Sequence, residues 1–156
     1  SSLPLPAVLA GFEGELYFQA DDSTSGIELW KTDGSEAGTG QVIDLNTGVT
    51  SSSNPRDLTV LEGTLYFAAT DGDGAELWRT DGTETGTTEV RDIDPGVGGS
   101  AISEIVVMND ALFFNADDGA TGDELWTSDG TEAGTVRVAD INTSGDSNPR
   151  DLFVFR

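Results

Sequence analysis

The sequence contains no cysteine and no histidine. Without cysteine, the chain can form no disulfide bond and offers no thiolate to a metal or a substrate. Without histidine, it lacks the commonest proton-transfer base near neutral pH, the imidazole ligand of zinc and copper, and any Ser/His/Asp catalytic arrangement. These two absences exclude many of the usual enzyme and metal-site chemistries.

Positive charge and long apolar runs are also scarce. The 7 Lys and Arg residues face 29 Asp and Glu residues, which gives a net charge of −22 at pH 7 over 156 residues. Such a chain is repelled by nucleic acids and by anionic membrane surfaces. No apolar run approaches the roughly 18 residues that a membrane-spanning helix needs. We therefore expect neither a nucleic-acid partner nor membrane insertion.

The sequence is rich in repetition. Trp30, Trp78 and Trp126 are spaced 48 residues apart, in the strings ELWKTDGSEAGT, ELWRTDGTETGT and ELWTSDGTEAGT. LYF or LFF precedes each string, and VIDLN, VRDID or VADIN follows it. Each unit thus holds four short runs rich in β-branched and aromatic residues, separated by turn-forming residues every 8–12 positions or so. Four antiparallel strands in a unit of this length are typical of a β-propeller blade.

The predicted fold is all-β, a β-propeller-type array of three four-stranded antiparallel blades in one repeat domain, 1–156. The blade units cover approximately 5–50, 51–99 and 100–147. A surplus segment, 148–156, begins NPRDLFVF and repeats NPRDLTVL at the start of the second unit. We expect this segment to be an extra leading strand, one that another chain can accept.

The ELW strings resemble the repeat family named for its ELWxxDGT signature, which is found in secreted and surface proteins of bacteria and is regarded as propeller-like. The resemblance covers nearly the whole chain in three copies. It implies an extracellular or cell-surface repeat module. It implies no activity, because the family motif carries no catalytic residue.

Three blades are too few for a closed ring, since propellers have about four to eight. We therefore expect a homo-oligomer in which the surplus strand completes a blade of another chain, as in β-augmentation. Twofold closure would give a dimeric six-bladed ring, and open association a head-to-tail filament. The alternative is that 148–156 is only the point at which the chain was cut. The residues assigned to assembly are Asn148, Pro149, Leu152, Phe153, Val154 and Phe155.

Carboxylates gather in the second hairpin of each unit, where DGDG at 71–74 places two of them beside flexible glycines. Hard cations such as Ca²⁺ accept oxygen clusters of this kind. The predicted Ca²⁺ ligands are Asp21, Asp22, Asp71, Asp73, Asp117 and Asp118, and Glu76 could add a further carboxylate. The competing interpretation is a solvated acidic surface with no bound cation.

The other repeated residues suggest structural roles. In the third hairpin, Asp81 should bond backbone N–H groups and Gly82 should adopt a positive φ, as should their copies at 33–34 and 129–130. Glu84 and its copies should face water. The tryptophans should pack between blades, although exposed indoles could instead form a sugar-stacking platform. Arg56 should pair with a carboxylate and help to fix the blade register.

These patterns favour a non-catalytic, extracellular structural or adhesive module that self-assembles and that Ca²⁺ could stabilise. The runner-up is a lectin-like propeller with one glycan site per blade, which would need exposed aromatic residues such as Tyr17, Tyr66 or the tryptophans. A carboxylate-only glycosidase is the weakest candidate, because the prominent carboxylates recur in every unit, whereas an active site usually needs one unrepeated group of residues. The sequence does not identify the ligand.

Overall fold

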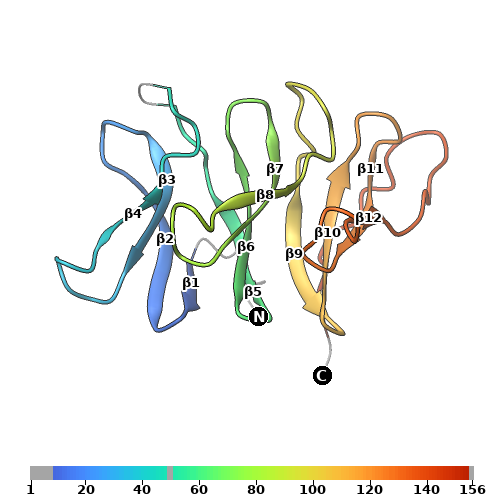
Figure 1. The fold of residues 1–156 in the computed structure, drawn as a ribbon. Helices are drawn as coiled ribbons and strands as arrows, with labels where there is room; N and C mark the ends of the chain where they lie inside the picture. The colour runs from blue at the N-terminus through green and yellow to red at the C-terminus, as the bar shows by residue number, and fades with distance from the viewer. Residues whose placement is uncertain (1–8, 49–50, 155–156) are drawn as a thin grey trace.

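The computed structural model describes residues 9–48 and 51–154, which form three four-stranded antiparallel sheets (Figure 1). The first sheet contains β1 (Leu9–Phe12), β2 (Glu15–Asp21), β3 (Ile27–Thr32) and β4 (Gly40–Ile43). The second contains β5 (Arg56–Leu61), β6 (Thr64–Thr70), β7 (Ala75–Thr80) and β8 (Thr88–Arg91). The third contains β9 (Ser103–Met108), β10 (Ala111–Asp117), β11 (Asp123–Ser128) and β12 (Val136–Arg137). Residues 5–8 and 49–50 of the first predicted unit, and residues 155–156 of the surplus segment, which include Phe155, lie outside the described residues.

The prediction of an all-β chain with three four-stranded antiparallel sheets is confirmed. Within each sheet the strands follow one another in sequence order, because short hairpins rich in glycine and aspartate join them. The same register recurs: Phe18 faces Trp30 across β2 and β3, and Phe67 faces Trp78 across β6 and β7. The described part of the chain has no helix that could cross a membrane.

The sheets lie side by side and share two apolar cores (Figure 1). The first strands are neighbours, since β5 contacts both β1 and β9. Leu58, Leu65 and Phe67 of the second sheet pack against the first sheet, whereas Tyr66 and Leu77 pack against the third. Each sheet therefore has a back face, toward the preceding sheet, and a forward face, toward the next one.

The surplus segment differs from its prediction, because residues 148–154 form no strand. A strand requires a hydrogen-bonded neighbour, and none of the described strands pairs with this segment. The segment nevertheless starts as a leading strand does. Asn148 N–H donates to Asp123 O at 3.2 Å, as Asn54 N–H does to Ile27 O.

Backbone angles extend this correspondence. Asn148 and Asp151 have φ values of 48° and 56°, and Asn54 and Asp57 at the start of β5 have 48° and 55°. Leu152 N–H also donates to Glu104 Oε2 of β9 at 2.8 Å. The segment thus begins a fourth unit beside β9, although none of the strands in the described ranges pairs with it.

Candidate functional site

The ELW hairpin ends in a turn that is built in the same way three times. Asp81 Oδ1 accepts hydrogen bonds from Thr83 N at 2.9 Å and from Thr83 Oγ1 at 2.7 Å. Asp33 and Asp129 do the same with the residue two positions on. These hydrogen bonds, the side-chain one first, lower the pKa of all three aspartates. The predicted turn is confirmed.

The central residues of this turn also behave as expected. Gly34, Gly82 and Gly130 have φ values of 92°, 90° and 86°, a region that favours glycine. The glutamate at the tip of each turn is exposed to water. These glutamates are Glu36, Glu84 and Glu132.

The glutamate of each ELW string is buried, which the sequence analysis did not predict. Glu76 Oε1 accepts from Ser100 N at 2.9 Å, and Glu76 Oε2 accepts from Ser100 Oγ at 2.8 Å and from Ile93 N at 3.0 Å. Glu28 accepts the three equivalent bonds from Leu45 and Ser53, and Glu124 accepts two of them, from Ile141 N and Ser147 Oγ. Each glutamate therefore fastens the connection that leaves its sheet, so the proposal of Glu76 as a cation ligand is wrong.

Burial and hydrogen bonding act in opposite directions on these carboxyls. Desolvation raises the pKa of Glu76 although several donors oppose it. Desolvation also acts to raise the pKa of Glu124, but hydrogen bonds from Ser147 and Ile141 outweigh it and the pKa is lowered. The balance between desolvation and hydrogen bonding therefore differs between these two carboxyls.

The aspartates predicted to bind Ca²⁺ hold local turns. Asp22 Oδ1 accepts from Thr24 N and Ser25 N, both at 2.8 Å, and Asp118 Oδ1 accepts from Ala120 N and Thr121 N. Asp21, Asp71 and Asp117 each accept one N–H from two residues on, and Asp73 donates the N–H that Asp71 accepts. In the described part of the chain, no three acidic side chains are close enough together to hold a metal ion.

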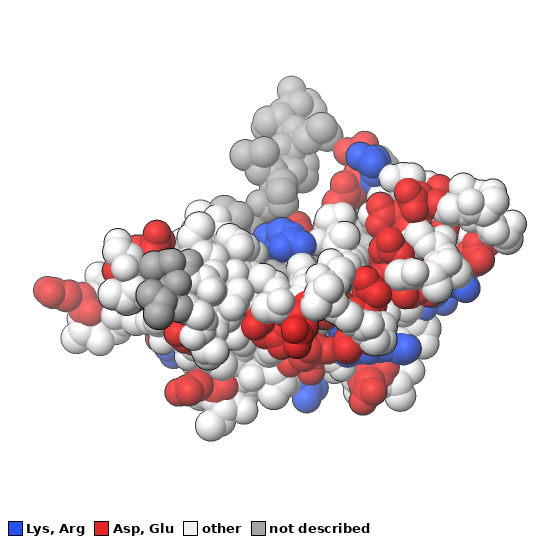
Figure 2. Space-filling model, turned by 90° about the horizontal axis from the view of Figure 1, so that it is seen from above, with Lys and Arg blue, Asp and Glu red and all other residues white. Residues whose placement is uncertain are grey.

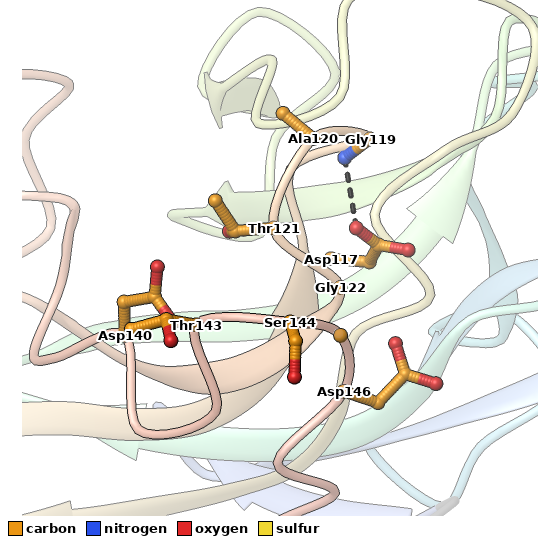
Figure 3. A pocket seen from close by; sticks show the side chains of 10 residues that line it. Asp117, Gly119, Ala120, Thr121, Gly122, Asp140, Thr143, Ser144 and Asp146 are labelled. Atoms are coloured by element: carbon orange, nitrogen blue, oxygen red, sulfur yellow. Dashed lines mark hydrogen bonds between the residues drawn. The ribbon is translucent and has the colours of Figure 1, made fainter.

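An open hollow of about 450 Å³ lies between the β10–β11 loop and the loop after β12 (Figure 3). Three aspartates line it, but their carboxylates do not converge, since Asp140 lies across the hollow from Asp117 and Asp146. Burial, followed by repulsion from Asp146 and Asp117, raises the pKa of nearby Asp123. The hollow is thus an electronegative surface and not a formed ligand cage.

The aromatic side chains are mostly internal. Trp78 and Trp126 are 8% and 5% exposed and pack on the forward face of the preceding sheet, so the predicted packing between units is confirmed for these two residues. Trp30, on the outer back face of the first sheet, is half-buried. Tyr17 and Tyr66 are also buried. These residues therefore do not form the exposed platform that sugar stacking would need.

The tyrosines contact glycines of the next sheet closely. A β-carbon added to Gly82 would overlap Tyr17 Oη, and one added to Gly130 would overlap Tyr66 Oη. Desolvation, followed by repulsion from Glu15, raises the pKa of Tyr17 to about 12. The two glycines therefore have a packing role as well as a conformational one.

Arginines cross between sheets to backbone carbonyls. Arg56 Nη2 donates to Ile102 O at 3.2 Å, and Arg91 Nη1 donates to Thr135 O at 2.6 Å. The predicted carboxylate partner of Arg56 is wrong, because among the described residues its side chain bonds a backbone carbonyl of the third sheet and forms no ion pair. This bond links the second sheet to the third.

Acidic side chains cover more of the surface seen in Figure 2 than basic ones do, and many of them gather over the third sheet, at the right. Basic side chains are scattered singly among them. Compared with known proteins, the chain matches no family model, no curated sequence and no solved structure. Its relation to the ELWxxDGT repeats remains a resemblance carried by the three ELW strings.

Proposed function

We propose that the chain is a non-catalytic structural and adhesive repeat module of the cell surface or extracellular space, which self-assembles into a larger array. One observation carries the proposal: the residues that recur in all three units maintain the fold. The aspartates form turns, the buried glutamates fasten loops, and two of the three tryptophans fill the spaces between sheets. Repetition of this kind serves a repeated architecture and not a single reaction centre.

We further propose that the sheets are blades of a propeller-like array. Adjacent first strands and sheets that pack face to face are features of such arrays. No sheet in the described part of the chain covers the two outer faces, so closure would require additional sheets. A second copy of the chain would bring the number to six, within the usual range of about four to eight.

Divalent cations would favour assembly by neutralising a surface of charge −22. The calcium proposal thus rests on overall acidity and on the electronegative hollow beside the third sheet. The buried positions of Tyr17, Tyr66, Trp78 and Trp126 give no support to glycan binding. We therefore put forward no second function.

Light scattering after size exclusion tests the proposal. We expect the protein to exceed the 16.3 kDa mass of one chain, with a discrete dimer indicating a ring and a broad, heavy peak a filament. Parallel runs in millimolar CaCl₂, in chelator, and in NaCl of matched ionic strength separate cation binding from screening. A monomer in every buffer would contradict self-assembly.

A further inference from the structure

Large apolar side chains are exposed at the outer back face of the first sheet. Leu16 is 43% exposed there, whereas the equivalent residues Leu65 and Leu112 are 0% exposed in the second and third sheets. Leu9 is likewise exposed where Leu58 is buried. The face is the same in all three sheets, but only in the first does no described sheet cover it.

A second exposed group lies on the outer forward face of the third sheet. Ile141 is 65% exposed, whereas its equivalents Leu45 and Ile93 are 8% and 4% exposed. The same holds for Met108 and Val138, which are exposed where Leu61 and Val90 of the second sheet are buried. Several large apolar side chains exposed on one face are typical of an interaction surface.

These outer faces are the two halves of an interface that the chain already makes twice. Its first occurrence joins the first sheet's forward face to the second sheet's back face, and its second joins the second and third sheets in the same way. We infer that the back face of the first sheet in one copy docks on the forward face of the third sheet in another. This inference rests on the proposed self-assembly and identifies its surface.

A second copy fits these faces because one chain carries both halves of the contact. The detailed contact is also available: no atom lies within 4 Å of the β-carbon position at Gly34, whereas Gly82 and Gly130 meet Tyr17 and Tyr66 there. Phe113 is the third-sheet equivalent of those tyrosines and would cover Gly34 of the other copy. The contact is heterologous, so it can close into a ring or continue as a filament.

In this arrangement, segment 148–154 occupies the position of the first strand of the docked sheet. The segment starts beside β9 in the same way as β9 starts beside β5. It therefore competes with β1 of the incoming copy for the place next to β9. The segment carries Leu152, Phe153 and Val154 where β1 carries Leu9, Ala10 and Gly11, and glycine weakens a strand interior. The segment therefore offers β2 of the incoming copy a second possible first strand, as in β-augmentation.

Two single variants and their mixture test the docking. Leu16→Lys blocks the back face and Ile141→Lys blocks the forward face, and each variant alone should be a monomer in light scattering at 0.5 M NaCl, where charge repulsion is screened. Mixed in equal amounts, they retain one intact pair of faces and should form a discrete heterodimer. Circular dichroism checks that each variant is folded.

The controls separate this inference from self-assembly in general. Val97 is 88% exposed in a loop, so Val97→Lys should assemble as the wild type does. If the wild type assembles and both face variants still do so, the interface is wrong while self-assembly stands. If Ile141→Lys alone dimerises, the contact is back face to back face. A wild-type monomer at about 100 μM would overturn both proposals.

Cross-linking tests the place of the segment. In the second sheet Val60 and Leu65 are directly paired, and the matching intermolecular pair is Val154 with Leu16. The natural chain has no cysteine, so a mixture of Val154→Cys and Leu16→Cys should give a mixed disulfide that mass spectrometry identifies, since paired strands meet the distance requirement. Yields no higher than for Val97→Cys with Leu16→Cys would show that the segment does not take the place of β1.

Discussion

A tyrosine packs closely on a glycine at both contacts between neighbouring sheets, and the equivalent glycine of the first sheet, which meets no tyrosine, serves as a control. Gly82 and Gly34 have nearly the same φ, 90° and 92°, but only Gly82 meets a tyrosine. Gly34→Ala should cost about 1 kcal/mol in stability from backbone strain. Gly82→Ala should cost about 1–3 kcal/mol more, because the new methyl group overlaps Tyr17 Oη. Urea denaturation measures both.

The hydroxyl itself can be removed to check the cause. In Tyr17→Phe, the ring carbon that carried the hydroxyl lies 3.5 Å from the new β-carbon, an ordinary contact distance. Gly82→Ala should therefore cost only about as much as Gly34→Ala in the Tyr17→Phe background. Equal costs for Gly82→Ala in both backgrounds would refute the packing role of the hydroxyl.

Glu89 on β8 is a residue at which ionisation opposes folding. Desolvation, followed by repulsion from Asp92 and Glu76, raises its pKa from 4.5 to about 7. Between these two pH values, the folded chain holds a proton on Glu89 that the unfolded chain has released. The free energy of unfolding therefore falls as the pH rises from about 4.5 through about 7. Glu89→Gln should be more stable than the wild type at pH 8, by less than about 1 kcal/mol because the group is partly exposed.

Thermal melts at pH 5 and pH 8 measure this effect. At pH 5 the two proteins should differ little, since wild-type Glu89 is then largely protonated when folded. Glu36→Gln, at an exposed turn, removes one charge without the burial and is the matched control for net charge. An equal gain from both variants at pH 8 would assign the effect to total charge alone.

At the scale of elements, each buried glutamate holds the loop that leaves its sheet by accepting hydrogen bonds from that loop. Glu76→Ala leaves the buried Ile93 N–H without its acceptor and removes both bonds to Ser100. We expect a loss of about 2–4 kcal/mol in the free energy of unfolding. Glu84→Ala, at an exposed hairpin tip, should change it by less than about 0.5 kcal/mol. Chemical denaturation giving similar values for both would contradict the fastening role.

The sequence predicted the strands well because their signals are local. Alternating apolar residues and Asp-Gly turns determine a hairpin within a dozen positions, and the turn at Asp81 matches its prediction down to the bonded N–H. The role of Glu76 was missed because its partners, Ile93 and Ser100, lie 17 and 24 positions away. Its one sequence signal was the same glutamate before Leu-Trp in all three units.

At the scale of the whole molecule, prediction from sequence was weaker. The supposed cation ligands were chosen by carboxylate spacing, but the structure uses five of the six, Asp22 among them, as acceptors for nearby N–H groups. The surplus strand was recognised from its similarity to β5, yet strand formation depends on a partner that local sequence does not specify. The contact between outer faces likewise depends on another copy of the chain, which a local sequence pattern does not specify.

Every sheet has a back face and a forward face of the same kind as the other sheets, and this has a consequence for how the gene can change. Each sheet packs on its neighbours, and both joints place a tyrosine against a glycine and a tryptophan against the preceding sheet. An in-frame duplication or deletion of one 48-residue period, the tryptophan spacing, would therefore leave every remaining joint intact. Genes encoding such units can change in length by unequal recombination, and each product would still fold with compatible ends.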